Sequence, residues 1–372
     1  MAAGLGLRPV AALAAPSKGA EHPKLLNQLL SEVFVAEAQG TCSLACLADD
    51  RGTINACSHL LMWVTLLLLL PSISRSYHPL VRHIDRAGIH RFSVNNDDAE
   101  LETQAIAEEK VMATAPQFRL TQMHEVSPSR LVSDMRKTGV VRVDGVLSPE
   151  SVVSIRHLIL EELERANQDV AEGRAAAAQL FSSSLSSRNR WDLKLPMTSQ
   201  VESALRSVLC RGSLLGDTLY QLVGDGGELF ELASFVTVNG AGRQVVHADT
   251  LWSRLPCLYT CTIALQDVSS AMGPTLFLKG SNSKAVHKQF DAKPTTLLGS
   301  TPYFLSTLSL GDAALYDSRT LHCGGANRSP TQRALFYFTF TNPEGFEEEE
   351  DAWNVASIRD ELRGKYRLRD FR

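Results

Sequence analysis

The sequence predicts a mainly β domain with flanking helices, arranged as a cupin-like jelly roll. From Leu229 onward, short segments rich in β-branched and aromatic residues follow one another, separated by Gly, Pro, Asn or Ser. Many short strands with such turns are typical of jelly rolls. With 372 residues and a formal charge of −4, the chain can build one sizeable core. The predicted strands are residues 230–238, 258–265, 275–278, 313–316 and 334–340.

Two helices and a strand are predicted ahead of this region. Ser127 and the proline after it begin a helix that continues to Lys137 and stops at Gly139, and residues 140–143 alternate enough for a strand. Ser148 caps a second helix, which has a proline in its first turn. Apolar residues recur along this helix at helical spacing, so we expect it to pack on the outside of the sheet. They are Val152, Ile155, Ile159, Leu163 and Ala166.

We expect residues 1–115 to be a targeting or low-order region and residues 116–372 to form the domain. Residues 1–24 are rich in Ala, Gly and Leu and have no acid before Glu21, which is typical of an organelle transit segment. The apolar run 60–70 is shorter than the roughly 20 residues of a membrane-spanning helix. It is compatible with membrane association but does not support a full span.

Three explanations of this run stay open: translation that begins at Met62, a buried helix, or a two-part targeting signal. For the N-terminal region we expect targeting to an organelle or to the secretory pathway, and without such targeting the protein would be cytoplasmic.

Composition argues against two classes of partner and site. The balance of 37 basic and 41 acidic residues gives no polyelectrolyte signal, so nucleic acid is not expected as a partner. Seven scattered cysteines argue against a disulfide scaffold. Cys42, Cys46, Cys57 and His59 lack the paired spacing of zinc fingers, which disfavours a zinc site there.

Other segments carry weaker expectations. Residues 91–110 are polar and acidic, as in a linker or a solvated helix, and residues 173–188 are Ala- and Ser-rich, as in a loop. Trp191 then has two interpretations, a substrate contact at the mouth of a site or a packing anchor. Residues 358–372 predict a basic helix that packs Leu362 and Phe371 on the domain.

A candidate metal site begins with His247 and Asp249, two positions apart, and His322 follows far along the chain. Two valines precede His247 and favour an extended backbone, in which residues i and i+2 share one face. His247 and Asp249 would then face one cavity while Ala248 faces away. Two imidazoles and one carboxylate on one side of a metal are the ligand set of non-haem Fe(II) oxygenases. The ordinary alternative is a surface His–Asp pair and an unrelated histidine.

Arg333 is a candidate anion-binding residue. It precedes the apolar residues 334–336, where a guanidinium would be costly to bury without an anion. Its planar fork can bind a carboxylate through two parallel hydrogen bonds. A structural salt bridge to an acid of the protein is the alternative.

Three runs together resemble a known family. They are GAGRQVVHAD (240–249), MGPTLFLKGSN (272–282) and LHCGGANRS (321–329), the last followed by Arg333. The region from about residue 126 to 340 resembles the phytanoyl-CoA dioxygenase family of Fe(II) and 2-oxoglutarate dependent oxygenases. The resemblance implies a double-stranded β-helix with His247, Asp249 and His322 as iron ligands. It also implies that Arg333 binds the distal carboxylate of 2-oxoglutarate.

The implied activity is hydroxylation of a small organic or lipid-like substrate by O2, with release of succinate and CO2. Thr262 and Tyr259, on a strand expected to face the cavity, and Gln244 are further candidates for cosubstrate binding. Cys323 should point away from His322 if the strand continues, so it is not assigned to iron. Two alternatives stay open: a cupin-like metal enzyme that uses no 2-oxoglutarate, and a non-catalytic binding protein on the same scaffold.

Overall fold

The computed structural model describes residues 96–122, 126–182, 188–345 and 356–372, all within the unit Leu80–Arg372. The expectations for residues 1–24, the run 60–70 and the cysteines at positions 42, 46 and 57 lie outside the described residues. The described strands are β1 (Gln117–Arg119), β2 (Val140–Val143), β3 (Phe181–Ser182), β4 (Arg190–Lys194), β5 (Leu229–Thr237), β6 (Leu258–Ala264), β7 (Thr275–Leu278), β8 (Tyr303–Leu305), β9 (Ala313–Asp317), β10 (His322–Gly324) and β11 (Arg333–Thr341).

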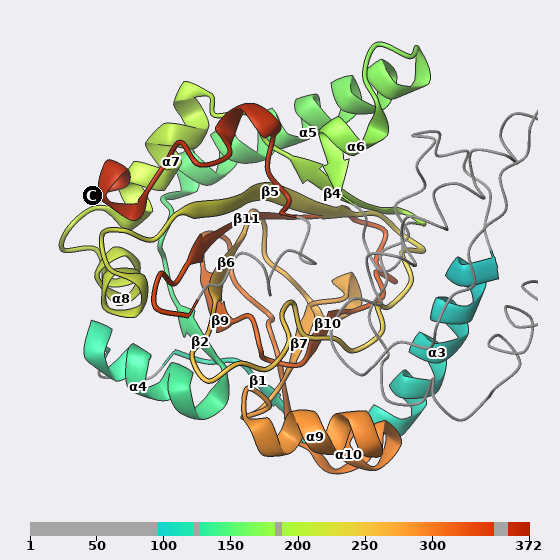
Figure 1. Cartoon of the computed structure of the whole chain (residues 1–372). Coiled ribbons are helices and arrows are strands. Elements are labelled where there is room, and N and C mark those ends of the chain that lie inside the picture. Colours follow the sequence, from blue (N-terminus) through green and yellow to red (C-terminus); the bar gives the residue numbers. More distant parts are fainter. Residues whose placement is uncertain (1–95, 123–125, 183–187, 346–355) are drawn as a thin grey trace, which may run out of the picture. The chain divides into compact units, whose positions relative to one another are not determined.

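These strands form the two sheets of a jelly roll (Figure 1). The larger sheet has the order β2-β9-β6-β11-β5-β4-β3, and the smaller has the order β1-β8-β7-β10. Their described neighbours pair antiparallel, apart from the parallel pair β1 and β8. The predicted strands are confirmed with ends that differ by one residue or none, because alternation and turn residues mark them locally.

The helices are α3 (Asn96–Met112), α4 (Pro128–Thr138), α5 (Pro149–Ala171), α6 (Ala177–Leu180), α7 (Ser199–Leu209), α8 (Leu214–Val223), α9 (Lys284–Ala292) and α10 (Pro294–Ser300), with short 3-10 turns η2 (Ser270–Met272), η3 (Asp360–Leu362) and η4 (Leu368–Phe371). The two predicted caps are confirmed. The Ser127 hydroxyl accepts from the Arg130 N–H, and the Ser148 hydroxyl accepts from the Ser151 N–H. Gly139 ends α4 in the left-handed conformation.

A large hydrophobic cluster lies between the larger sheet and its helices. The predicted stripe of α5 is buried and packs with residues of α7 and α8 and with alternate residues of the strands. Figure 1 shows α5 and α7 over the outer face of β5 and β11. On β11 the phenylalanines 336, 338 and 340 enter this cluster, so Arg333, Leu335 and Tyr337 face the other side of the sheet.

A second cluster fills part of the space between the two sheets. Phe277 of β7 meets Tyr316 of β9 with ring centroids 5.1 Å apart, and Leu335 and Ala264 belong to the same cluster. Because the interior face of the larger sheet also carries charged and hydroxyl side chains, the rest of this space is a polar pocket.

Helix α3 covers the outer side of the smaller sheet together with α10. Met112 is buried in a cluster with residues of β7, β8 and α10, and Glu108 is 8% exposed. Of the two interpretations of residues 91–110, the solvated helix is confirmed from residue 96, because α3 is helical and mostly exposed, whereas a linker is contradicted because packing begins before residue 116. Most of α3 is exposed and polar, and its narrow buried stripe includes a charge, so sequence periodicity did not reveal it.

Two other segments differ from expectation. Residues 173–188 contain α6 and β3, with residues 183–187 outside the described part. Residues 358–372 form the turns η3 and η4 instead of one helix, although Leu362 and Phe371 are buried as predicted. Among the described helices, none combines the length and apolar character needed to cross a membrane.

Candidate metal centre

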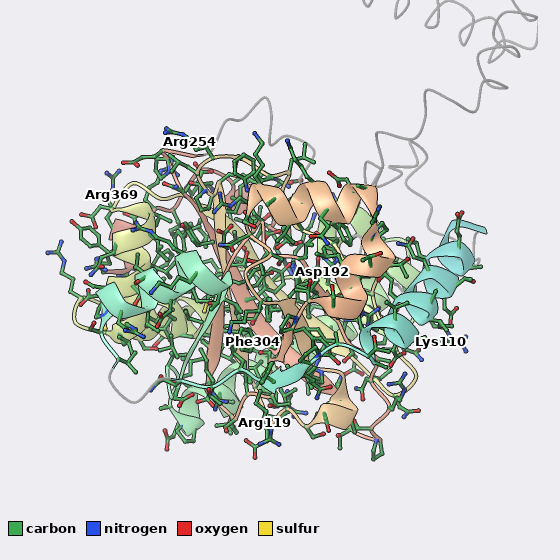
Figure 2. The ribbon with its side chains drawn as sticks, turned by 90° about the horizontal axis from the view of Figure 1, so that it is seen from below. Lys110, Arg119, Asp192, Arg254, Phe304 and Arg369 are labelled. Atoms are coloured by element: carbon green, nitrogen blue, oxygen red, sulfur yellow. The ribbon has the colours of Figure 1, made fainter. Side chains whose placement is uncertain are left out.

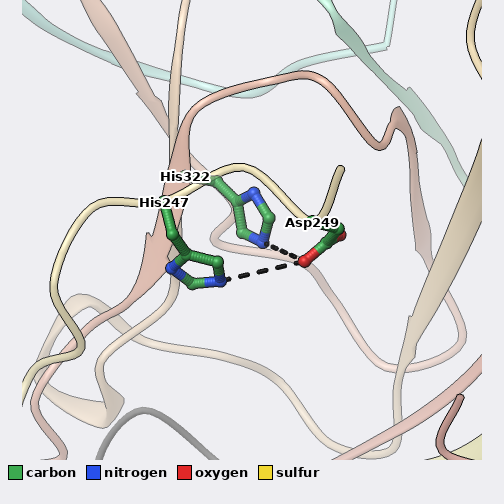
Figure 3. A group of neighbouring side chains, drawn as sticks. All are labelled: His247, Asp249 and His322. Carbon is green, nitrogen blue, oxygen red and sulfur yellow. Dashed lines mark ion pairs between the residues drawn. The ribbon is translucent and has the colours of Figure 1, made fainter. Parts of the chain in front are cut away.

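His247, Asp249 and His322 bring three ligand atoms together inside the jelly roll (Figure 3). One oxygen of Asp249 lies 3.8 Å from Nε2 of His247 and 3.7 Å from Nε2 of His322. The three ligand atoms all lie within 4.8 Å of one another. This is the only such group of three or more metal-binding side chains in the described part of the chain. The prediction that the three residues meet is confirmed.

The backbone fixes this arrangement through two segments that run antiparallel. The N–H of each histidine donates to the carbonyl of the other, at 2.9 Å from His247 and 2.7 Å from His322. The Asp249 N–H donates to Ser318 O at 2.9 Å. The segment before His247 pairs through two isolated bridges, Ala241 with Asn327 and His247 with His322, so the strand expected there does not form. The expected alternation still holds, because Ala248 and Cys323 pack in the cluster on the opposite face.

Hydrogen bonds orient both imidazoles with Nε2 toward the centre. Nδ1 of His247 lies 3.0 Å from Val245 O, and Nδ1 of His322 lies 2.9 Å from Thr320 O. Because a carbonyl oxygen only accepts, each Nδ1 carries a hydrogen, which leaves Nε2 as the nitrogen that can bind a metal. Such outer contacts fix the tautomer and orientation of metal-binding histidines.

Aromatic rings hold the His322 imidazole from its other sides. The rings of Tyr316 and Phe277 lie 4.9 Å and 5.6 Å from it, centroid to centroid. Two imidazole nitrogens and one carboxylate oxygen on one side of a centre suit Fe(II) with open positions, whereas a structural zinc site uses four protein ligands. The donor set therefore fits a ferrous ion.

The Arg333 guanidinium lines the same pocket and is 1% exposed. One terminal nitrogen donates to Gly273 O, and Nε has no hydrogen-bond partner. Within the described residues no carboxylate forms an ion pair with it, so the structural salt bridge is not found there. Burial, followed by the charge of Arg190, lowers the pKa of Arg333 to about 9. The site holds a buried cation in need of an anion.

Of the other candidates for cosubstrate binding, two line the pocket and one does not. Thr262 lines the pocket, and Gln244 also lines it while its Oε1 accepts from the Gly324 N–H at 2.8 Å. The placement predicted for Tyr259 is wrong, because its side chain packs in the cluster under the helices. Tyr259 and Thr262 are three positions apart on β6, and residues an odd number apart point to opposite faces of a strand. Burial then raises the pKa of the Tyr259 hydroxyl.

The sequence interpretation missed a polar wall on the sheet face that also carries Arg333. Asp192 accepts hydrogen bonds from the Tyr337 hydroxyl at 2.7 Å and from the Ser357 hydroxyl at 2.9 Å. Burial and nearby carboxylates raise the pKa of Glu231, which lines the same wall, to about 7. Figure 2 shows Asp192 well inside the outline of the domain in that view, and it is 4% exposed. The alternation of charges at positions 190, 192 and 194 was the available signal.

Trp191 lies between two of these charges and packs against the cluster under the helices. This placement supports its interpretation as a packing anchor.

Comparison with known proteins gives one family and several similar structures. The family model described as Phytanoyl-CoA dioxygenase (PhyH) matches residues 135–335, which is more than half of the chain. The non-haem alpha-ketoglutarate dependent epimerase SnoN of nogalamycin biosynthesis is 20% identical, with a TM-score of 0.41, over 57% of this chain and 81% of that one. EctD from S. alaskensis is 15% identical, with a TM-score of 0.43, over 68% and 91%. A search of curated proteins found no match.

Proposed function

Because the chain belongs to the phytanoyl-CoA dioxygenase family, we propose that it is a non-haem Fe(II) and 2-oxoglutarate dependent dioxygenase that hydroxylates a small organic or lipid-like substrate and releases succinate and CO2. The observation that carries the proposal is that one pocket combines a group of metal-binding side chains with a buried cation. It contains the ligand set of His247, Asp249 and His322, and it contains the buried guanidinium of Arg333, which forms no ion pair with a carboxylate of the described residues.

Each residue has a distinct role in this proposal. The two Nε2 atoms and the Asp249 carboxylate hold the ion. The bound iron, together with the keto acid, supplies the oxidation of a substrate C–H bond by O2. Arg333 binds the distal carboxylate through its fork, which orients the cosubstrate and removes the need to order it during the reaction. Tyr316 and Phe277 keep the His322 ring in place.

The walls of the pocket favour a small polar substrate over a lipid-like one. Asp192, Glu231, Tyr337 and Ser357 form the polar wall of the pocket, and each offers hydrogen-bonding atoms. A hydrocarbon chain placed there would keep water from the carboxylate lone pairs that these groups leave unused, which costs free energy. A polar group of the substrate placed there would instead hydrogen-bond to this wall.

Anaerobic titration of the full chain tests the proposal. Fe(II) followed by 2-oxoglutarate should produce a metal-to-ligand charge-transfer band, and replacing His247 or Asp249 with Ala should abolish it. His157→Ala is the matched control, because its side chain is 73% exposed on α5. A substrate screen that monitors succinate then follows.

The outcomes separate the alternatives. Metal binding without any response to 2-oxoglutarate would favour a cupin-like metal enzyme of another type. Failure to bind Fe(II) would favour a binding protein on the same scaffold. A band that survives in the Asp249→Ala variant would overturn the ligand assignment.

A further inference from the structure

The pocket contains a second buried guanidinium, that of Arg190, which the sequence motifs do not include. Arg190 on β4 and Arg333 on β11 both pair with Thr237, on the β5 strand that separates them. Residues in register on neighbouring strands project to the same face of a sheet. Strands two places apart lie about 10 Å apart, a span that two long arginine side chains can close from both sides.

Both guanidiniums reach the pocket and are held only by backbone oxygens. Nη2 of Arg190 donates to Gly242 O at 2.8 Å and to Gly325 O at 3.1 Å, while Arg333 donates to Gly273 O. Nε of each arginine has no hydrogen-bond partner. The two side chains are therefore anchored at their ends and still have donors to offer inside a common cavity.

Glycine at position 324 makes room for the first of these guanidiniums. A Cβ at Gly324 would lie 2.7 Å from Nη1 of Arg190 and 2.5 Å from Oε1 of Gln244. Real Cβ atoms do not approach other atoms so closely, so a side chain here would displace one of the two groups. The glycine after Cys323 is thus matched to the position of Arg190.

Two like charges buried together need an anion. Arg190 is 3% exposed and Arg333 is 1% exposed, and within the described residues neither forms an ion pair with a carboxylate. Burial lowers the pKa of Arg190 to about 10, and the charge of Arg190 adds to the effect of burial on Arg333. Both remain cations at neutral pH, so their desolvation and mutual repulsion are relieved when an anion binds between them.

We propose that Arg190 is a second cosubstrate-binding residue, and that its guanidinium and that of Arg333 together hold the distal carboxylate of the keto acid. This inference rests on the proposed function. A carboxylate of the substrate has the same chemistry and is the other source of an anion for Arg190. Before substrate binds, the keto acid's distal carboxylate is the only one of these two anions present. Binding measurements without substrate therefore distinguish the two sources.

The test measures keto-acid binding by calorimetry on the full chain loaded anaerobically with Fe(II). The ligands are 2-oxoglutarate and 2-oxopentanoate, which has the same chain length and keto acid group but no distal carboxylate. Arg190→Gln should raise the Kd for 2-oxoglutarate about ten- to a hundredfold, as expected for loss of a charge-assisted hydrogen bond. The Kd for 2-oxopentanoate should change less than twofold. Arg190→Lys keeps the charge without the planar fork. Its Kd for 2-oxoglutarate should therefore lie between that of the parent and that of Arg190→Gln.

Two controls accompany this variant. Arg188→Gln removes an exposed guanidinium two positions away and should leave both Kd values unchanged. Without ligand, the thermal unfolding temperature of Arg190→Gln should equal or exceed that of the parent, because an unpaired buried charge is removed.

Three results would overturn the inference. If Arg190→Gln leaves the Kd for 2-oxoglutarate unchanged while Arg333→Gln raises it, Arg190 serves another anion. A rise in KM for a carboxylate substrate would then identify that anion. If Arg190→Gln weakens the binding of both keto acids equally, Arg190 does not bind the distal carboxylate, and it acts on the part that both ligands share or on the fold. If the parent protein itself binds no 2-oxoglutarate, the proposed function has failed, and the inference with it.

Discussion

Replacing Glu108 with Ala should destabilise the domain and weaken the metal centre together. Glu108 lies on α3, and its Oε2 accepts from the Val246 N–H at 2.7 Å, one residue before the proposed ligand His247. The same oxygen lies 3.4 Å from Nη1 of Arg243, and both side chains are less than 10% exposed. A single carboxylate thus fixes the ligand-bearing segment and neutralises a buried guanidinium.

The magnitude follows from these two contacts. Removing one partner of a buried ion pair costs about 3–5 kcal/mol, because the other charge is left without compensation. Arg243 keeps hydrogen bonds to Ala105 O and Met112 Sδ, neither of which carries a charge. At about 2–4 °C per kcal/mol, the expected fall in unfolding temperature is about 6–20 °C. Glu108→Gln also leaves Arg243 without a counter-charge but keeps an acceptor for the Val246 N–H, so it should cost less than Glu108→Ala by about 0.5–1.5 kcal/mol.

Thermal and urea unfolding of the metal-free full chain measure the stability, and Fe(II) titration measures the metal affinity. Glu109→Ala is the matched control on the same helix, since Glu109 pairs with Arg328 through side chains that are 39% and 64% exposed. Such a surface pair contributes about 0–1 kcal/mol. If Glu108→Ala unfolds within about 0.5 kcal/mol of the parent and of Glu109→Ala, α3 does not support the site as argued.

Two further predictions concern charge and backbone. Burial and then the carboxylate of Asp249 raise the pKa of Glu231 from 4.5 to about 7, so the folded metal-free protein holds a proton that the unfolded chain has released. As the pH rises from about 4.5 to about 7, the free energy of unfolding should therefore decrease by roughly 3 kcal/mol at most. Urea unfolding at several pH values should show a weaker pH dependence for Glu231→Gln. An equal pH dependence in both proteins would exclude Glu231 as its source. Gly273 has φ +67°, and an added Cβ would lie 2.5 Å from the Gly325 and Ala326 carbonyl oxygens. Gly173 is the control, because it has φ +71° but an added Cβ there would have no atom within 4 Å. Gly173→Ala should lower the free energy of unfolding by about 1–3 kcal/mol through backbone strain alone, and Gly273→Ala should lower it clearly more. Equal losses in urea unfolding would show that the close approach at Gly273 has no energetic cost.

The sequence by itself determined the local features of this protein. Helix starts are marked by Ser127 and Ser148, whose hydroxyls accept hydrogen bonds from free backbone N–H groups of the first turn. Gly139 marks a helix end because a residue without a side chain adopts the left-handed conformation easily. The predicted strands were found because alternation and turn residues act over a few positions. His247 and Asp249 could be placed on one side because i and i+2 share a face in any extended segment.

Only the tertiary structure decided which distant residues meet. The alternation that places Thr262 in the pocket excludes Tyr259, but the sequence does not say which face of β6 looks inward. The position of Arg190 beside Arg333 depends on the register in which β4 and β11 pair with β5. This register is set by hydrogen bonds between residues that are far apart in the sequence. The docking of α3 through Glu108 depends on the buried charge of Arg243, 135 positions away. Contacts of this kind arise from non-local pairing and packing, whereas periodicity and capping report only on a residue's immediate neighbours.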